Sequence, residues 1–549
     1  MLILLALCPV ATVAILLVLL RWPAKRAMPV AYALTAGVAL FAWKMPLARV
    51  AASTIEGAII AVSVLYIVFG AVLLLNTLQA SGAVGTIRHG FLALSPDRRV
   101  QTLIVAWLFG SFIEGASGFG TPAAVAAPLL LALGFPALAT VLATLIIQST
   151  PVSFGAVGTP ILIGVNNGLS GSPLVATRLA ELGITQGEYL LQLAARVAIL
   201  HGLIGTFLPL LLVCVITRFF GAARSWRDGL GIWKFALFSG FSFTVPYTLT
   251  AVFLGPEFPS LIGGLIGLAV VVTAARRGFL LPKTTWDFPP RNEWPAAWLG
   301  SLKIEETPVA NAPGLLRAWM PYVFVGGLLV LTRLNTLPLK AWLLSVRVGW
   351  TNILGTGIKA AIEPLYLPGT VFLVVVITTW WLHRMPGSAR RQAIGASVLT
   401  LKGTCIALLF AIPLARIFIN SGVNDAGLPS MPLLLAQNAA QVAGSAWPLV
   451  APCVGAFGAF IAGSNTVSNM MFSLFQFGVA DTIGVSTLWV VALQAVGGAA
   501  GNMVCIHNVV AASATVGLAG REGTLIRDVL IPFCYYLLAA GLLGFALTR

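Results

Sequence analysis

The chain contains the stretch GSFIEGASGFGTP at residues 110–122, inside a long apolar region. A related stretch, GAFIAGSNTVSN, occurs in the other half of the chain at residues 458–469. Gly, Phe, Ile and Gly coincide in the two stretches at an offset of 348 residues. Further along, an offset of 346 matches Gln148 and Gly155 with Gln494 and Gly501, so a small insertion or deletion separates the copies. The chain therefore carries an internal repeat, with one copy in each half.

Glycine and small polar residues are unexpected in apolar stretches of this kind, because they interrupt helices and expose backbone groups. Such interruptions are tolerated at membrane depth only where the backbone faces protein or a water-filled cavity. Interrupted segments at corresponding places in two halves are the best sequence indicator of a transporter's binding site. The alternative is that the small residues only allow helices to pack closely. The pairing of the two copies favours a binding site.

The composition is that of an integral membrane protein. Of the 549 residues, 59% are hydrophobic and only 9% are charged, and the mean hydropathy is +0.97. A soluble domain would carry about 25% charged residues. The net charge of +16 lies mostly in loops between apolar runs, as the positive-inside rule expects, and indicates no nucleic acid. The six cysteines are scattered without a metal-binding or disulfide pattern, and we expect no metal and no cofactor.

Apolar runs long enough to cross the bilayer predict about twelve transmembrane helices. They fall near residues 2–20, 29–43, 54–77, 137–165, 189–217, 232–254, 258–275, 319–333, 367–383, 398–420, 486–518 and 529–547. The first run has no basic region before it and no small-residue cleavage site after it, so it is interpreted as a retained span and not as a signal peptide.

Two further regions, 101–135 and 437–480, each join two apolar arms through the glycine-rich pattern, and the arm near 123–135 is too short to span. This predicts re-entrant hairpins. All basic loops fall on one side only if each hairpin returns to the face it entered from. Both termini are then outside, and the hairpins enter from opposite faces. The predicted fold is an all-α polytopic protein with an inverted-topology repeat.

Three units follow from this pattern. Residues 1–230 form an N-terminal membrane repeat with the first broken hairpin and broken helix. Residues 231–318 hold connecting spans and a polar cytoplasmic linker, 278–318, and residues 319–549 form the C-terminal repeat.

The breaks supply the chemistry of an anion site. Thr121-Pro122 has the pattern of a helix start, because Thr caps exposed amides and Pro suits the first turn. Ser468-Asn469 is a similar candidate in the second copy. The following runs are interrupted as well, at 148–151, 158–160, Gly497-Gly498, Gly501-Asn502 and His507-Asn508. Helix N-termini carry about half a positive charge, so several converging starts bind an anion without a buried Arg.

The hydroxyls, amides and glycines at these breaks are the predicted substrate contacts. They are Ser117, Gly118, Thr121, Gln148, Ser149, Thr150, Ser464, Asn465, Thr466, Ser468, Asn469, Asn502 and Asn508.

Ionisable residues inside apolar stretches are functional candidates by default. Glu114 adjoins the first break and is the leading proton carrier, with capping of backbone amides as its alternative. Glu56 and His507 are further proton-coupling candidates. His201 is a candidate relay or a buried hydrogen-bonding residue, and Arg196 on the same span is expected to snorkel or pair. Lys402 and Arg416 are interpreted as the two ends of one span.

Residues 114–122, EGASGFGTP, and 501–515, GNMVCIHNVVAASAT, resemble hallmarks of the lactate permease family of bacterial secondary transporters. Residues 520–523, 255–259 and 316–319 are also similar, so the resemblance covers nearly the whole chain. It implies proton-coupled import of L-lactate, with D-lactate and glycolate as co-substrates, across the bacterial plasma (inner) membrane. The implied partners are a small monocarboxylate, a proton and the lipid bilayer, and a homodimer is compatible with them.

Residues 464–466, SNT, are similar to the hairpin tips of sodium–dicarboxylate symporters, whose wider superfamily implies an elevator-like mechanism. The first copy departs from that pattern with ASG at 116–118, which favours a proton over paired sodium sites. A sodium-coupled organic anion symporter remains the alternative. An intramembrane enzyme with Ser468 or Ser513 as nucleophile and His507 as base lacks any supporting motif, so the expected protein is not an enzyme.

Single cysteines placed near Gly118 and at Thr466, in a background lacking the six native cysteines, are expected to be labelled from opposite sides of the membrane. The reason is that inverted hairpins approach the midplane from opposite faces. Impermeant thiol reagents added to either side of oriented vesicles measure this. Labelling of both positions from one side would contradict the inverted arrangement.

Overall fold

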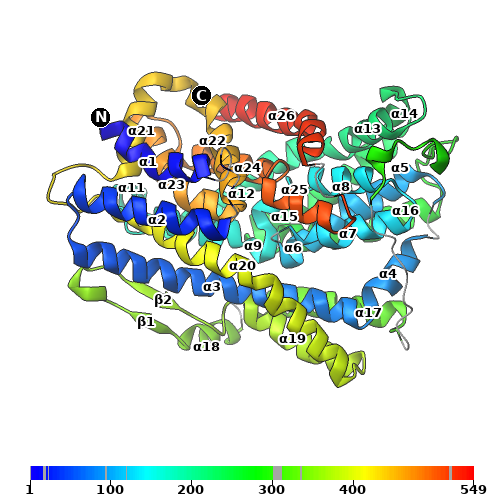
Figure 1. Cartoon of the computed structure of the whole chain (residues 1–549), viewed down its shortest axis with the longest axis horizontal. Coiled ribbons are helices and arrows are strands. Elements are labelled where there is room, and N and C mark those ends of the chain that lie inside the picture. Colours follow the sequence, from blue (N-terminus) through cyan, green and yellow to red (C-terminus); the bar gives the residue numbers. More distant parts are fainter. Residues whose placement is uncertain are drawn as a thin grey trace.

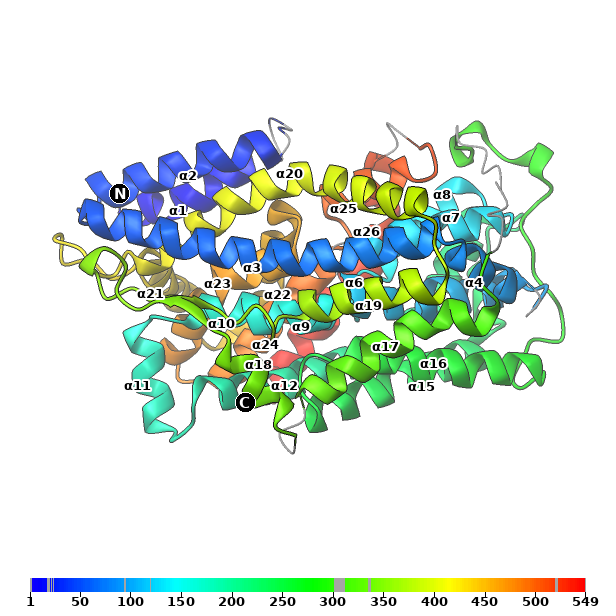
Figure 2. The same cartoon turned by 90° about the horizontal axis from the view of Figure 1, so that it is seen from below.

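The computed structural model describes residues 2–16, 20, 22, 24–92, 95–118, 120–300, 312–333, 337–518 and 522–548. Helices dominate this part of the chain, and many of them run roughly along one direction (Figures 1 and 2). Among the described residues, eight helical segments are long and apolar enough to cross a membrane: Leu47–Ala80, Arg98–Ser117, Val152–Leu169, Gln186–Phe220, Trp233–Phe253, Pro259–Arg276, Met431–Ala462 and Gly523–Leu547.

The expected multi-pass helical class is confirmed, whereas the expected number of spans is not. Six further apolar helices are shorter: Leu2–Ala14, Ala137–Ile146, Leu315–Leu329, Pro368–Leu382, Cys405–Asn420 and Thr487–Gly501. The expected runs 137–165 and 486–518 are each divided by irregular backbone instead of forming one continuous helix. Broken helices therefore account for much of the difference from twelve spans.

Two long helices, α3 (Leu47–Ala80) and α20 (Gly387–Asn420), lie side by side along the molecule (Figure 2). Gly57 permits their contact, because a Cβ there would lie 2.4 Å from the Cα of Pro413. α2 (Ala24–Phe41) packs on α20, and α19 (Pro368–Leu382) packs on α3. α1 (Leu2–Ala14) and α17 (Leu315–Arg333) then pack on α2 and α19 respectively. The two halves thus repeat one packing pattern.

Polar side chains link α3 to α20 at repeat-related positions. Arg416 donates to Glu56 Oε1 at 2.6 Å, and Asn420 donates to Glu56 Oε2 at 2.8 Å. Toward the opposite ends of the same two helices, Asn76 of α3 donates to Ser397 Oγ of α20 at 2.8 Å. Asn76 and Arg416 differ by 340 in number, as do the first residues of the two helices. One of these contacts between α3 and α20 is therefore an ion pair, and the other is a neutral hydrogen bond.

The interpretation of Lys402 and Arg416 as the ends of a span was wrong. Lys402 lies in the interior of α20 on an exposed face, whereas Arg416 is only 2% exposed. Arg416 also donates to the carbonyls of Asn167 and Ser170, near the end of a helix in the first repeat. The ion pair with Glu56 explains how the charge of Arg416 is buried. Hydropathy alone had placed this charge at the end of a span.

Each predicted hairpin region forms two helical arms joined by a short break. The first has α5 (Arg98–Gln101), η2 (Thr102–Phe109) and α6 (Gly110–Ser117) as one arm and α7 (Thr121–Ala132) as the other. The second has α22 (Trp447–Ala462) and α23 (Asn465–Thr482). In Figure 1 the base of the first hairpin lies toward the right of the molecule and α23 runs toward the left, with the breaks near the centre.

The element that follows each hairpin is also interrupted. α8 (Ala137–Ile146) leads into irregular backbone that contains η3 (Val152–Phe154) and α9 (Gly155–Thr159), followed by η4 (Pro160–Val165) and α10 (Asn166–Leu169). α24 (Thr487–Gly501) is followed by a short turn and α25 (Ile506–Ala514). The predicted breaks at 148–151, 158–160 and Gly501-Asn502 are confirmed.

Two local predictions were wrong. α23 begins at Asn465, after Ser464, so Ser468-Asn469 lies inside the helix and does not cap it. Gly497-Gly498 lies within α24. A Cβ at Gly497 would come within 2.0 Å of the Pro452 carbonyl, so that glycine allows α22 and α24 to pack closely instead of breaking the helix. In the first hairpin, Thr121 is the first helical residue, and Pro122 follows it as predicted.

The remaining elements surround this core. α12 packs on α15 and α24, α16 packs on α6, and α26 packs on α22 and α24. Their bounds, with the smaller elements, are α4 (Ala83–Leu92), α11 (Pro173–Glu181), α12 (Gln186–Gly205), α13 (Leu208–Phe220), α14 (Trp226–Leu230), α15 (Trp233–Phe253), α16 (Pro259–Arg276), η5 (Arg291–Glu293), η6 (Ala296–Trp298), α18 (Leu339–Ser345), β1 (Val348–Trp350), η7 (Ile353–Gly355), β2 (Ala360–Ile362), α21 (Met431–Ala443), η8 (Gly444–Ala446) and α26 (Glu522–Leu547). β1 and β2 pair antiparallel.

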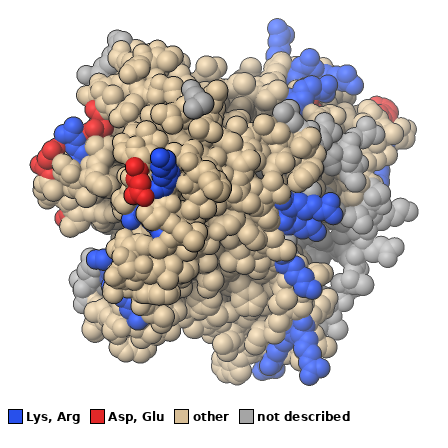
Figure 3. Space-filling view, turned by 60° about the vertical axis from the view of Figure 1, so that its left-hand side comes forward, with Lys and Arg blue, Asp and Glu red and all other residues tan. Residues whose placement is uncertain are grey.

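Charged side chains are unevenly distributed on the surface. On the face in Figure 3, most Lys and Arg side chains gather toward the right, and most acidic side chains lie toward the left. This asymmetry is what the positive-inside rule expects of a multi-pass protein.

Arg416→Ala is expected to lower the free energy of unfolding by about 3–5 kcal/mol, because it leaves the buried Glu56 carboxylate without its ion-pair partner. Thermal unfolding of the detergent-solubilised protein measures the change. Arg347→Ala is the matched control, because its ion pair with Glu363 spans 3.3 Å and the Arg347 side chain is 66% exposed. Equal effects of the two substitutions would show that the buried pair has no special role.

Candidate functional site

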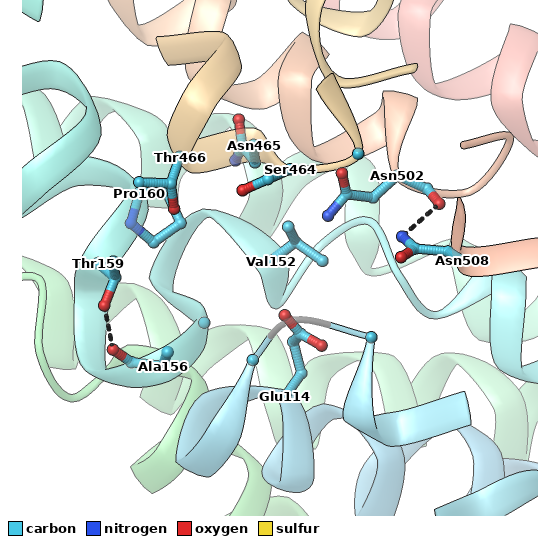
Figure 4. Close-up of a pocket in the computed structure, with 14 residues that line it drawn as sticks. Glu114, Val152, Ala156, Thr159, Pro160, Ser464, Asn465, Thr466, Asn502 and Asn508 are labelled. Carbon is cyan, nitrogen blue, oxygen red and sulfur yellow. Dashed lines mark hydrogen bonds between the residues drawn. The ribbon is translucent and has the colours of Figure 1, made fainter. Parts of the chain in front are cut away.

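A pocket lies where the two hairpin breaks meet the two interrupted helices (Figure 4). The free space is about 330 Å³, including the part that opens to the outside. The lining residues come from both repeats: Glu114, Gly118, Gly120, Val152, Gly155, Ala156, Thr159, Pro160, Gly463, Ser464, Asn465, Thr466, Asn502 and Asn508.

Both hairpin breaks use left-handed backbone. Gly118, Gly120 and Gly463 have φ values of 62°, 77° and 74°, a region that residues with a Cβ rarely adopt. Gly118 also packs against the interrupted helix, since a Cβ there would lie 2.8 Å from the backbone nitrogen of Ala156. Glycine at these breaks therefore permits both the sharp turn and the close approach of backbone to backbone.

The backbone between α8 and η4 is strained. Ala156 and Val157 have φ values of 42° and 59°, which are unusual for an alanine and more so for a β-branched residue. Gly158 continues the left-handed run with a φ of 74°, and Thr159 Oγ1 donates to the Ala156 carbonyl at 2.6 Å. Strained conformations of this kind persist where surrounding structure fixes them, and they cluster at functional sites.

Several helix N-termini meet at the pocket. Gly120 precedes α7, Ser464 precedes α23, and Thr159-Pro160 opens the helix formed by η4 and α10. Asn508 lies in the first turn of α25. Their unpaired backbone amides and dipoles favour an anion. None of the described lining residues is Lys or Arg, so the helix N-termini are the features of this lining that favour an anion.

Unpartnered polar atoms are concentrated here. Glu114 Oε2, Asn465 Oδ1 and Asn502 Oδ1 line the pocket and have no hydrogen-bond partner within the described part of the chain. Gln148 Nε2 and Asn469 Oδ1, just behind the pocket, are also buried and unpaired. Buried polar atoms without partners are rare and require an explanation. These atoms are therefore the polar groups that the pocket offers to a ligand.

Glu114 is the one acidic residue among the described residues that line the pocket. It is 2% exposed and lies on the opposite side of the pocket from Ser464, Asn465 and Asn502 (Figure 4). Gly155 makes room for its carboxylate, because a Cβ there would lie 2.6 Å from Glu114 Oε1.

Comparison with known proteins identifies the family. The L-lactate permease family profile matches residues 3–549.

The chain belongs to the L-lactate permease family.

Its relatives include a Haemophilus influenzae protein named as a candidate L-lactate permease, 31% identical over 95% of this chain and 93% of that protein. The Escherichia coli L-lactate permease is 29% identical over 90% of this chain and 86% of its own length. The E. coli glycolate permease is 27% identical over 95% and 91% respectively. A solved structure, the YdaH transporter of Alcanivorax borkumensis, is 17% identical and covers 73% of this chain and 86% of its own, with a TM-score of 0.29.

The family places this chain among the permeases, so it is a transporter and not an enzyme. The bacterial relatives and the apolar helices make it a multi-pass protein of the bacterial plasma membrane.

The permease brings many of the predicted site residues together. Glu114 and six of the predicted substrate contacts line the pocket: Gly118, Ser464, Asn465, Thr466, Asn502 and Asn508. Gln148 lies behind them and accepts a hydrogen bond from Asn508 at 2.8 Å. Asn469 donates to the Pro160 carbonyl at 3.1 Å, and Ser468 to the Gly455 carbonyl at 2.8 Å. These three support the pocket from outside its lining.

Other predicted residues point elsewhere. Ser117 and Ser149 hydroxyls donate to nearby carbonyls of the preceding turn, those of Ile113 and Ile146. Thr150 bonds to a tyrosine on α26, and Glu56 pairs with Arg416 outside the pocket lining. The side chains of Thr121 and His507 lie outside the described residues.

The predicted contact set omits Val152, Gly155, Ala156, Thr159, Pro160 and three other lining positions, although it includes their neighbours. Thr159-Pro160 repeats the Thr-Pro pattern of residues 121–122. That repetition was the available signal for a second helix start at the pocket.

Gly155→Ala is expected to lower Vmax/KM for transport about tenfold or more, because overpacking against Glu114 costs about 1–3 kcal/mol. Uptake by purified permease in proteoliposomes measures this. Gly37→Ala is the control, since a Cβ at Gly37 in α2 meets nothing within 4 Å. Normal uptake by the Gly155 variant would mean that the Glu114 carboxylate is free to move without consequence.

Proposed function

We propose that this permease imports a small 2-hydroxy monocarboxylate, namely L-lactate, D-lactate or glycolate, together with a proton. The observation that carries the proposal is the pocket itself. It combines converging helix N-termini, unpartnered amide oxygens and one buried carboxyl group, without a basic side chain among its described lining residues. The names of the relatives, L-lactate permease and glycolate permease, support the same substrate class.

The proposed binding mode assigns each part of the substrate a partner. The carboxylate accepts hydrogen bonds from backbone amides at the starts of α7, α23 and the η4–α10 helix, where the dipoles favour negative charge. The 2-hydroxyl donates to an unpaired oxygen of Asn465 or Asn502. Gln148, Ser468 and Asn469 act by holding the lining residues in place.

Glu114 is the proposed proton carrier. Bringing an anion across the membrane alone moves one charge through the potential, about 2.3 kcal/mol per 100 mV. A proton bound at the same site makes the loaded carrier neutral and allows the pH gradient to drive accumulation. Glu114 lies in the pocket with one oxygen unpaired. His507 and Glu56 are the next candidates, in that order, because Glu56 already has two partners outside the pocket.

The proposed membrane arrangement follows the repeat. The two hairpins are re-entrant and enter from opposite faces, and their breaks meet at the pocket near the midplane. Residues 1–230 and 319–549 are the two membrane repeats, with residues 231–318 between them. Alternating access then moves the pocket against the α3–α20 pair in an elevator-like manner.

Glu114→Gln is expected to abolish proton-driven accumulation of L-lactate while exchange of L-lactate across the membrane continues, because glutamine keeps the shape but carries no exchangeable acidic proton. Both activities are measured in proteoliposomes with an imposed pH gradient, with and without a sodium gradient. Glu293→Gln is the control, since Glu293 is an exposed residue of the 278–318 linker.

Unchanged accumulation in the Glu114 variant would make Glu114 structural and move the search to His507. Accumulation that requires a sodium gradient would instead establish the sodium-coupled alternative. Absence of L-lactate and glycolate uptake by the unaltered protein would refute the substrate class.

A further inference from the structure

The irregular backbone at residues 147–154 is held by side chains from several surrounding helices. Tyr247 of α15 donates to the Thr150 carbonyl at 2.8 Å, and Ser260 of α16 donates to the Pro151 carbonyl at 2.7 Å. Ser153 donates to the Ala495 carbonyl of α24 at 3.1 Å. The bonds to Thr150 and Pro151 satisfy carbonyls that the break leaves without helical partners, and the bond from Ser153 ties the segment to α24. Gly155, two residues after Ser153, lines the pocket.

His201 of α12 joins this anchoring to α26. One ring nitrogen, Nε2, lies 2.8 Å from Ser153 Oγ, and the other, Nδ1, lies 2.5 Å from the Tyr536 hydroxyl. Tyr536 is in turn 3.0 Å from Thr150 Oγ1. His201, Tyr536, Thr150 and Ser153 are all buried completely or nearly so. The imidazole is therefore bonded directly to Ser153 and, through Tyr536, to Thr150. These two residues lie on either side of Val152, which lines the pocket.

With a neutral imidazole, all hydrogen bonds of this series can run in one direction, so that every group in it has a partner. Thr150 donates to Tyr536, Tyr536 donates to Nδ1, Nε2–H donates to Ser153, and Ser153 donates to the Ala495 carbonyl. An imidazolium would donate from both nitrogens, so Tyr536 would turn its proton to Thr150. The Thr150 hydroxyl would then lack an acceptor among the described residues. The hydrogen-bond pattern thus favours the uncharged ring.

Among the described residues, His201 has hydrogen-bond and ring contacts to uncharged groups only. The groups that face the ring are the aromatic rings of Tyr247 and Tyr536, with centroids 6.2 and 5.7 Å away. Arg196, on the same helix, lies over the Trp489 ring at 5.5 Å. No carboxylate among the described residues hydrogen-bonds to His201.

We propose that His201 is a positioning residue for the substrate pocket, which acts through Ser153, Thr150 and Tyr536 and does not carry the coupled proton. This inference rests on the proposed function for its transport readout. Its physical content is that the 147–158 segment stays in the shape that lines the pocket only while the chain of hydrogen bonds is complete. Loss of the chain frees Val152 and Gly155 to shift, and Gly155 lies against Glu114.

The test compares His201→Ala, His201→Gln, Tyr536→Phe and Ser153→Ala in the full-length permease. His383→Gln is the matched control, because His383 bonds to Ser81 and the Arg317 carbonyl away from the pocket. His201→Ala is expected to raise the KM for L-lactate about tenfold, since it leaves buried partners unsatisfied. His201→Gln should raise KM less, because its amide can still donate to Ser153. Vmax, its pH profile and the proton-driven accumulation ratio should stay near the wild-type values.

The double variant His201→Ala/Tyr536→Phe is expected to raise KM no further than His201→Ala, because both substitutions break one chain. An unchanged KM in Tyr536→Phe and Ser153→Ala would overturn the inference, even if His201→Ala did not fold. Loss of proton-driven accumulation in His201→Gln with exchange intact would also overturn it, because His201 would then be a proton carrier.

A second measurement does not depend on the substrate. Hydrogen–deuterium exchange of the amides in 147–158 is expected to accelerate in Tyr536→Phe and His201→Ala and to stay unchanged in His383→Gln. Unchanged exchange in the first two variants would refute the anchoring directly. If the unaltered protein exchanges as expected but transports neither L-lactate nor glycolate, the proposed function fails while the anchoring is still decided by these variants.

Discussion

The structure depends on one constraint: a helix broken in a membrane must find partners for the backbone groups that the break exposes. Side-chain amides near the breaks donate to backbone carbonyls of neighbouring elements. Asn465 donates to the Ala495 carbonyl, Asn469 to the Pro160 carbonyl and Asn508 to the Asn502 carbonyl. The side-chain nitrogen of each of these three amides therefore stabilises the fold. The side-chain oxygens of Asn465 and Asn502 have no partner among the described residues and stay available at the pocket, as acceptors for a hydroxyl group.

The positions of the breaks were predictable. Glycine and polar residues in an apolar run have few explanations, and their recurrence in both halves excluded most of these explanations. The exact ends of the helices were harder to predict. Glycine in a membrane helix permits either a turn or a close approach of two backbones, and the sequence does not distinguish these uses. Gly463 takes the left-handed turn, whereas Gly497 lies in a continuous helix against the Pro452 carbonyl. Only the packing of α22 on α24 separates the two cases.

The same reasoning explains which site residues were found. Gly118, Ser464, Asn465 and Thr466 reached the pocket because the two hairpin breaks meet there, whereas Ser117 is turned back to the Ile113 carbonyl. Ser149 and Thr150 did not, because irregular backbone follows no helical period, so their side-chain directions could not be derived from spacing. The long-range partners were also out of reach of sequence reasoning. Arg416 meets Glu56 across 360 positions and His201 meets Tyr536 across 335, and no local pattern encodes such pairs.

The two repeats share a backbone plan but not their charges, and this difference has consequences for transport. Glu114 lies in the pocket, whereas its counterpart at the 348-residue offset is Ala462. Similarly, Glu56 and Arg416 form an ion pair where the related crossing has Asn76 and Ser397. A repeat of this kind can adopt two states by exchanging the roles of its halves, and identical side chains would give those states equal energies. In the proposed transport cycle, charged residues without a charged counterpart at the related position, such as Glu114 opposite Ala462, would therefore make the two states unequal in energy. Under the proposed function, the single carboxyl group in the pocket would match one proton to one monocarboxylate, and the loaded carrier would then be neutral in either state.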